Sequence, residues 1–176
     1  MSAPERRVIY RGRKIDLALQ AVRLADGTST DREVVIHRGA VVLAPMVDRD
    51  HVCLLRHERY SVGKTLIELP AGTIDPGETA ASTAPRELAE ETGYRAGKLT
   101  RVAEWWVSPG VFTERMTLYL CEDLVPGPTD HQPDERMQPL ILPWDEAVAM
   151  ASDGRIDDAK TILSLLLLDK ARRTSC

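Results

Sequence analysis

The chain has 176 residues, a formal net charge of −4 and a hydrophobic content of 43%. These values suit one folded domain with a substantial core, and they predict no nucleic-acid partner held by bulk charge. Its three cysteines, Cys53, Cys121 and Cys176, are widely spaced and odd in number, so we expect no disulfide framework and a reducing, cytoplasmic location. The apolar run Leu165–Leu168 is far too short to cross a bilayer, so no membrane partner is expected.

The first 37 residues have the pattern of a small antiparallel sheet. Strands are predicted at Val8–Tyr10, at Ile15–Ala21 and at Arg32–His37, with a hairpin turn at Asp26-Gly27. So small a sheet is marginal alone. We therefore expect residues 1–37 to form a subdomain that packs on residues 38–176 or on another subunit.

The rest of the chain alternates between strand and helix patterns. Strands are expected at Ala40–Val47, His51–Arg56, Thr65–Leu69, Leu99–Val107, Arg115–Leu124 and Met137–Leu142. Helices are expected between Thr79 and Gly93, at Trp144–Ser152 and at Asp158–Arg172, with Arg56–Tyr60 near a loop and Val125–Glu135 as a loop. This order predicts an α/β fold, more fully an α+β fold, with helices packed on sheet.

The stretch from Gly72 to Tyr94 carries the densest cluster of charge. On a helix, Glu87, Glu90 and Glu91 stand at i, i+3 and i+4 and share one turn, with Cβ atoms roughly 5–6 Å apart. Three like charges repel one another, so the cluster predicts a hard divalent cation, Mg²⁺ or Mn²⁺. The other explanation is the solvated acidic face of an exposed helix.

The spacing of this stretch is more specific than its charge. Gly72 is followed by Glu78, by Arg86-Glu87-Leu88, by Glu90-Glu91 and by Gly93-Tyr94, at the intervals of the complete Nudix box. The chain therefore resembles the Nudix hydrolases. That resemblance implies a mixed β-sheet sandwiched between helices, and metal-dependent cleavage of a nucleoside diphosphate linked to another group.

The resemblance also implies roles for the box residues. Glu87 and Glu91 are then the main metal ligands, with Glu90 beside them and the backbone carbonyl of Ala71 as a further ligand. The catalytic set implied is Glu78, Arg86, Glu90 and Glu135, in which Glu78 and Arg86 pair to hold the loop against the helix.

Sequences outside the box resemble the ADP-ribose pyrophosphatase subgroup. These are the lead-in Glu68–Gly72 and the run Ser108–Gly110 with Glu114 after it. They imply hydrolysis of ADP-ribose to AMP and ribose 5-phosphate, in a homodimer built through the N-terminal sheet. Two alternatives stay open: another nucleoside diphosphate sugar such as GDP-mannose, and a sensor module that binds a nucleotide sugar without chemistry.

The same resemblance points to substrate-binding residues at Arg59, Arg32, Glu114 and Pro109. The forked guanidinium of Arg59 suits a phosphate, although Arg59 could equally be an ordinary surface arginine. Glu135 resembles a general base carried on a loop, and the other explanation is a solvated loop acid. Glu114 is the rival base or a ribose contact.

Two further features are less regular. Pro85 falls inside the expected helix, where an interior proline costs about 3 kcal/mol. We therefore expect the helix to kink there or to begin near Thr83. Trp105 and Trp106 could stack on adenine, but neighbouring strand residues face opposite sides, and a core position is favoured for Trp106 as well.

Overall fold

The computed structural model describes residues 5–130 and 136–174. Within them the strands are β1 (Arg6–Arg11), β2 (Ile15–Arg23), β3 (Ser29–His37), β4 (Ala40–Pro45), β5 (His51–Arg59), β6 (Lys64–Glu68), β7 (Ala71–Thr73), β8 (Tyr94–Trp106), β9 (Arg115–Pro126) and β10 (Met137–Pro143). The helices are α1 (Ala80–Thr92), α2 (Trp144–Asp153) and α3 (Ala159–Thr174). The expected α+β class is confirmed. None of the helices described is long and apolar enough to cross a membrane.

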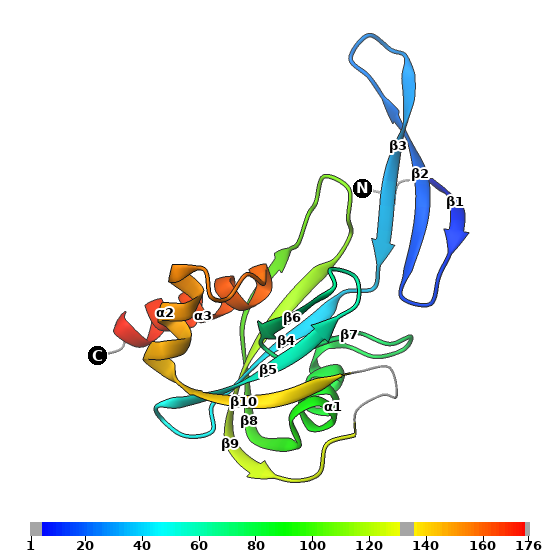
Figure 1. Ribbon diagram of the computed structural model, residues 1–176. Helices are drawn as coiled ribbons and strands as arrows, with labels where there is room; N and C mark the ends of the chain where they lie inside the picture. Colours follow the sequence, from blue (N-terminus) through cyan, green and yellow to red (C-terminus); the bar gives the residue numbers. More distant parts are fainter. Residues whose placement is uncertain (1–4, 131–135, 175–176) are drawn as a thin grey trace.

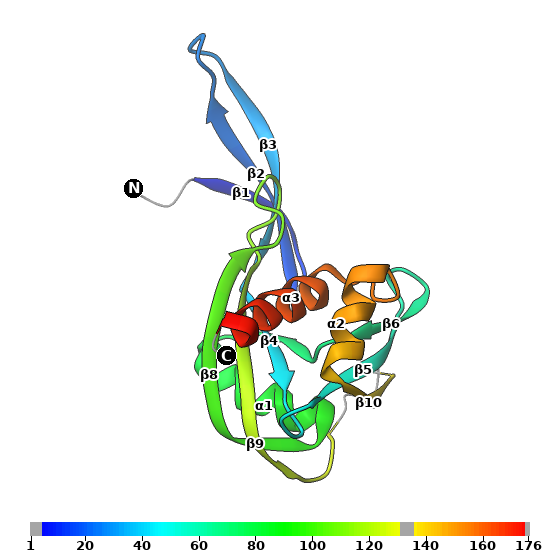
Figure 2. The ribbon, with the colours of Figure 1, turned by 90° about the vertical axis from the view of Figure 1, so that its left-hand side faces the viewer.

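The N-terminal strands form a sheet of their own. β1, β2 and β3 pair antiparallel in that order, and the β2–β3 hairpin turns at Gly27, whose φ of 86° favours glycine. Figures 1 and 2 show this sheet extending away from the rest of the molecule. The three predicted strands and the hairpin turn are confirmed.

The C-terminal end of β3 is joined to the rest of the molecule by hydrogen bonds of its backbone. Val35 on β3 donates to Val111 O (2.8 Å) and accepts from Thr113 N (2.9 Å), and His37 N donates to Thr113 Oγ1 (2.9 Å). The loop that joins β8 to β9 thus holds the C-terminal end of β3.

β4 lies at the centre of the molecule. It pairs parallel with β9 and antiparallel with β7 in a sheet of order β7-β4-β9-β8, while β10, β5 and β6 form a separate antiparallel sheet. Every residue of β4 is buried, which explains its apolar character on both faces. Val41 and Leu43 pack with α1 residues, and Val42 and Ala44 pack with the cluster that includes α2 and α3. The predicted sheet between helices is therefore present.

Several predicted boundaries were wrong because strand pairing extends the elements. β5 continues to Arg59, which pairs with Lys64 on β6, instead of ending at Arg56. β9 runs on to Pro126 opposite Tyr94. The segment expected as pure loop before the helix contains β7, because it pairs with the start of β4.

Helix α1 spans Ala80–Thr92, so the expected helix between Thr79 and Gly93 is confirmed. Of the two outcomes expected from Pro85, a start near Thr83 was wrong. Thr79 caps it: Thr79 Oγ1 accepts from Ser82 N (3.2 Å) and Ser82 Oγ accepts from Thr79 N (2.9 Å). Pro85 lies inside the helix, on its exposed side. The cap and the burial of Ala84 and Leu88 offset the cost of the proline. A kink at Pro85 stays a prediction.

Candidate active site

A cavity of about 760 Å³ opens beside the start of β4 and β9. Its walls include residues of the acidic stretch together with two of the predicted substrate contacts: Ala71, Gly72, Arg86, Glu87, Glu91, Arg59 and Glu114. The fold therefore brings together residues that lie far apart in the sequence.

Glycine at position 72 lets a carboxylate approach the backbone. A Cβ built on Gly72 would lie 1.9 Å from Cδ of Glu87, so any larger residue would displace that carboxylate. Glu91 is 4% exposed, and its Oε2 accepts the N–H of Ala71 (2.9 Å). Two glutamates of α1 are thus held against β7, which carries the predicted carbonyl ligand.

Arg86 connects the remaining acids of the box. Its Nε and Nη2 donate to the two carboxylate oxygens of Glu78 (3.0 and 2.9 Å), so the predicted pair is present. Hydrogen bonds from Arg86 and then Thr83 lower the pKa of Glu78 to about 2. The pair with Glu78 raises the pKa of Arg86, and Glu87 and Glu90 add to this effect.

The arrangement of these acids determines how they could bind a metal ion. Nη1 of Arg86 contacts both Glu87 Oε1 (2.8 Å) and Glu90 Oε2 (3.1 Å). Among the residues described, no three His, Cys, Asp or Glu side chains converge on one metal position. The donor set still fits a hard ion, because it consists of carboxylates and a carbonyl. The absence of a side chain at Gly72 lets the Glu87 carboxylate lie close to the backbone of β7.

Arg59 lines the cavity and is hydrogen-bonded to a buried carboxylate. Glu68 is 1% exposed and accepts from Arg59 through both oxygens, at 2.9 and 2.7 Å. Lys160 contacts the same carboxylate. Burial opposes ionisation of Glu68, but Arg59 and Lys160 outweigh it and bring the pKa down to about 2. Sequence reasoning used Glu68 only as part of a lead-in and assigned no role to Lys160.

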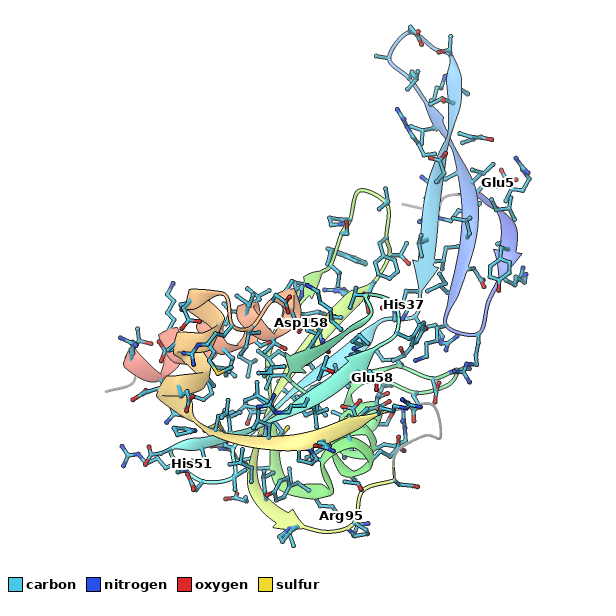
Figure 3. All side chains as sticks on the ribbon, viewed as in Figure 1. Glu5, His37, His51, Glu58, Arg95 and Asp158 are labelled. Carbon is cyan, nitrogen blue, oxygen red and sulfur yellow. The ribbon has the colours of Figure 1, made fainter. Side chains whose placement is uncertain are left out.

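Glu114 lies at another wall of the cavity, beside His37. Its Oε1 is 3.6 Å from Nδ1 of His37, which accepts the N–H of Gly39 (3.0 Å). Burial raises the pKa of Glu114, and burial lowers the pKa of His37 with help from Arg38 and Lys14. His37, labelled at the foot of the N-terminal sheet in Figure 3, is therefore a neutral neighbour that does not hold Glu114 ionised.

The two tryptophans also line the cavity. Trp105 is half-buried and packs on the core. The core position favoured for Trp106 was wrong, because its side chain is 52% exposed. The guanidinium of Arg115 lies 5.3 Å from the Trp106 ring centre. An exposed indole face at the cavity suits stacking of a base.

Two predicted substrate contacts lie away from the cavity. Pro109 is exposed in the β8–β9 loop, and Arg32 is exposed on β3 opposite Gln20, and neither lines the cavity within one chain. Glu135 lies outside the described residues. Of the general-base candidates, Glu114 is the one that the described part of the chain places at the cavity.

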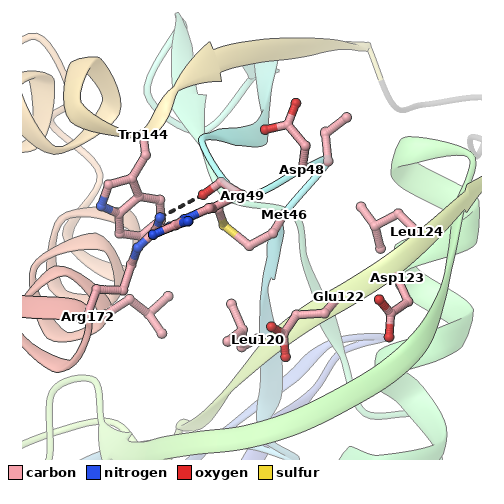
Figure 4. Close-up of a pocket in the computed structure, with 11 residues that line it drawn as sticks. Met46, Asp48, Arg49, Leu120, Glu122, Asp123, Leu124, Trp144 and Arg172 are labelled. Carbon is pink, nitrogen blue, oxygen red and sulfur yellow. Dashed lines mark hydrogen bonds between the residues drawn. The ribbon is translucent and has the colours of Figure 1, made fainter. Parts of the chain in front are cut away.

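A second cavity, of about 490 Å³, lies at the opposite ends of β4 and β9 (Figure 4). Arg172 stacks over the Trp144 ring at 4.7 Å and donates to Arg49 O (2.6 Å). None of the box residues lines this cavity. The larger cavity is therefore the candidate active site.

Comparisons with known proteins agree with this geometry. The NUDIX domain matches residues 36–165. The chain is 33% identical over 162 residues to an ADP-ribose pyrophosphatase of Bacillus subtilis (strain 168), covering 91% of this chain and 88% of that protein. It is 31% identical over 162 residues to a GDP-mannose pyrophosphatase of Shigella flexneri serotype 5b (strain 8401), covering 80% and 82%. A crystal structure of an ADP compounds hydrolase has the same fold, with a TM-score of 0.83, 24% identity and coverage of 99% and 97%. The chain belongs to the Nudix hydrolase family.

Proposed function

We propose that this Nudix hydrolase cleaves the diphosphate of ADP-ribose to give AMP and ribose 5-phosphate, with Mg²⁺ or Mn²⁺. The observation that carries the proposal is the cavity that joins the carboxylates of Glu87 and Glu91 to Arg59 and Glu114. The Bacillus subtilis relative, named for hydrolysis of ADP-ribose, supports the choice of substrate.

The metal would be held by Glu87, Glu90, Glu91 and the carbonyl of Ala71. When bound, a divalent ion supplies neutralisation of the diphosphate charge and Lewis acidity. Glu78 keeps Arg86 on the helix face, and Arg86 orients Glu87 and Glu90 through Nη1.

The other walls of the cavity act on the substrate. Arg59 binds a phosphate through its guanidinium, and Trp106 offers a face for the base. A carboxylate takes the proton of the attacking water. Glu114 can do so because its raised pKa makes it a better proton acceptor than an ordinary glutamate. Glu135 is the second candidate for this role.

We further propose that residues 1–37 form a dimerisation subdomain and that the protein is a cytoplasmic homodimer. Ile9 and Tyr10 on β1 are 49% and 61% exposed in one chain, which supports burial against a second copy. Arg32 and Pro109 would then meet the substrate only in the dimer.

A second candidate function is hydrolysis of GDP-mannose, supported by the Shigella flexneri relative. A sensor without chemistry is less well supported, because the chain retains Glu87, Glu90 and Glu91.

A substrate panel tests these proposals. ADP-ribose, GDP-mannose and related sugars are incubated with Mg²⁺, with and without chelator, and products are separated by chromatography. We expect AMP and ribose 5-phosphate from ADP-ribose only when metal is present. Turnover of another sugar nucleotide without turnover of ADP-ribose would reject the substrate. Binding without any turnover would favour the sensor.

A further inference from the structure

Glu68 joins two cations at the wall of the candidate active site. Its carboxylate accepts from Arg59 Nε at 2.9 Å and from Arg59 Nη2 at 2.7 Å. Glu68 therefore occupies the edge of the guanidinium that carries Nε and Nη2. Its Oε2 also contacts Nζ of Lys160. Arg59, Glu68 and Lys160 all line the cavity. This leaves the terminal edge of the guanidinium, which carries Nη1, as the edge directed away from Glu68.

Lys160 lies in the first turn of α3 and is held in turn by Asp158, two residues earlier and just before the helix. Its Nζ lies 2.9 Å from Oδ2 of Asp158. The same oxygen accepts from Thr161 N (3.0 Å) and Thr161 Oγ1 (2.6 Å), and Thr161 Oγ1 accepts from Leu69 N (2.8 Å). The N-terminus of α3 is therefore hydrogen-bonded to the backbone of Leu69, the residue that follows Glu68. Figure 3 labels Asp158 at this point of the fold.

The contacts restrict the orientation of Arg59. A guanidinium gripped along one side by two parallel hydrogen bonds keeps its plane and direction. The side chains of Glu68 and Lys160 are 2% and 10% exposed, while that of Arg59, which faces the cavity, is 35% exposed. Water therefore has little access to the carboxylate that holds Arg59. An arginine already ordered in this way loses less conformational freedom when it binds a phosphate.

We propose that Glu68 and Lys160 are positioning residues for substrate binding, which hold Arg59 so that the terminal edge of its guanidinium receives a phosphate of the substrate. The inference rests on the proposed function, since it takes a nucleoside diphosphate sugar as the ligand. It adds that the N-terminus of α3, far along the chain from the Nudix box, sets the affinity for that ligand.

A double-mutant cycle between Lys160 and Arg59 tests the proposal. Lys160→Met should raise KM about tenfold with kcat nearly unchanged, and Lys160→Arg should restore KM. In an Arg59→Ala background, Lys160→Met should produce no further rise, because the residue that it positions is gone. An equal rise in KM in both backgrounds, or no rise in either, would overturn the proposal.

A matched control separates positioning from stability. Lys98→Met removes another lysine–glutamate pair, Lys98 with Glu122 (2.7 Å), on the exposed surface of β8 and β9. It should leave KM unchanged. Thermal unfolding is followed for every variant, and a purely structural Lys160 would lower the melting temperature without a KM change that depends on Arg59. If Lys160→Met does not fold, Lys160→Gln replaces it in the cycle.

The substrate assignment can fail separately. If the wild-type protein hydrolyses a sugar nucleotide other than ADP-ribose, the same cycle is run with that compound. Calorimetric binding of the compound in the presence of chelator repeats the comparison without turnover. There, the loss of affinity from Lys160→Met should again vanish when Arg59 is alanine.

Discussion

The candidate active site contains two networks centred on arginines, and they differ in charge balance. Around Arg86, the carboxylates of Glu78, Glu87, Glu90 and Asp75 lie within 4 Å of one guanidinium. Around Arg59, two cations face two anions, since Lys160 joins Arg59 while Glu68 and Asp158 oppose them. An excess of acid leaves negative charge for a further cation, whereas a network with equal numbers of cations and anions leaves no excess negative charge for one.

The networks also differ in exposure. The side chains of Glu78 and Glu90 are 25% and 28% exposed, while that of Glu68 is 2% exposed, so the difference lies in the acids and not in the two arginines. Exposed pairs contribute little to stability and can exchange partners, but a buried pair that loses one member leaves an uncompensated charge. We infer that the Arg86 network serves chemistry and that the Arg59 network serves the position of a binding residue.

The largest effect expected is on the acid-rich network. Glu91→Gln keeps an oxygen that can accept the Ala71 N–H but removes the charge that a metal needs. We expect kcat to fall at least about 100-fold, which exceeds the loss typical of residues that only support metal ligands. Assays with Mg²⁺ measure kcat, and circular dichroism measures whether the variant is folded. Full activity in the variant would show that Glu91 is not a ligand.

The next effect concerns the space beside Glu87. Gly72→Ala puts a methyl group where the Glu87 carboxylate lies. That carboxylate is at the end of a flexible side chain, so it should move aside and cost about 1 kcal/mol of stability or less, while activity falls roughly tenfold or more. Gly110→Ala is the matched control, because a Cβ there meets nothing within 4 Å. Equal activity in both variants would mean that the position of Glu87 is unimportant.

A smaller effect is expected from the balanced network as pH changes. The pKa of Glu68 is lowered from 4.5 to about 2 in the folded protein, so its contribution is complete above pH 4.5 and is lost as pH falls toward 2. The shift corresponds to about 3 kcal/mol, of which about 2 kcal/mol should be gone by pH 3.

Urea unfolding at pH 7 and pH 3 measures this contribution. Glu68→Gln should be less stable than wild type at pH 7, and the difference should narrow at pH 3. A difference that does not change with pH would mean that Glu68 stabilises the fold through packing and not through its charge.

Much of the Arg86 network could be predicted from the sequence, because it is local. Glu78, Arg86 and Glu90 lie within thirteen positions on a loop and one helix, and helical periodicity places the acids on one turn. The cap at Thr79 and the left-handed Gly93 at the other end of α1 were recognisable for the same reason. The later start of α1 near Thr83, one of two outcomes expected from Pro85, did not occur, since a local rule about Pro85 ignored the packing of Ala84 and Leu88.

The sequence by itself determined the family, the strand and helix order, and the acids of the box, because spacing and periodicity act over a few residues. Only the tertiary structure decided that Glu68 and Lys160 meet, since they are 92 positions apart and each is an ordinary charged residue in its own segment. It also decided that β5 extends to Arg59 and that Trp106 faces the cavity. These contacts depend on which strands pair and which helix covers them, and that is a property of the packed chain.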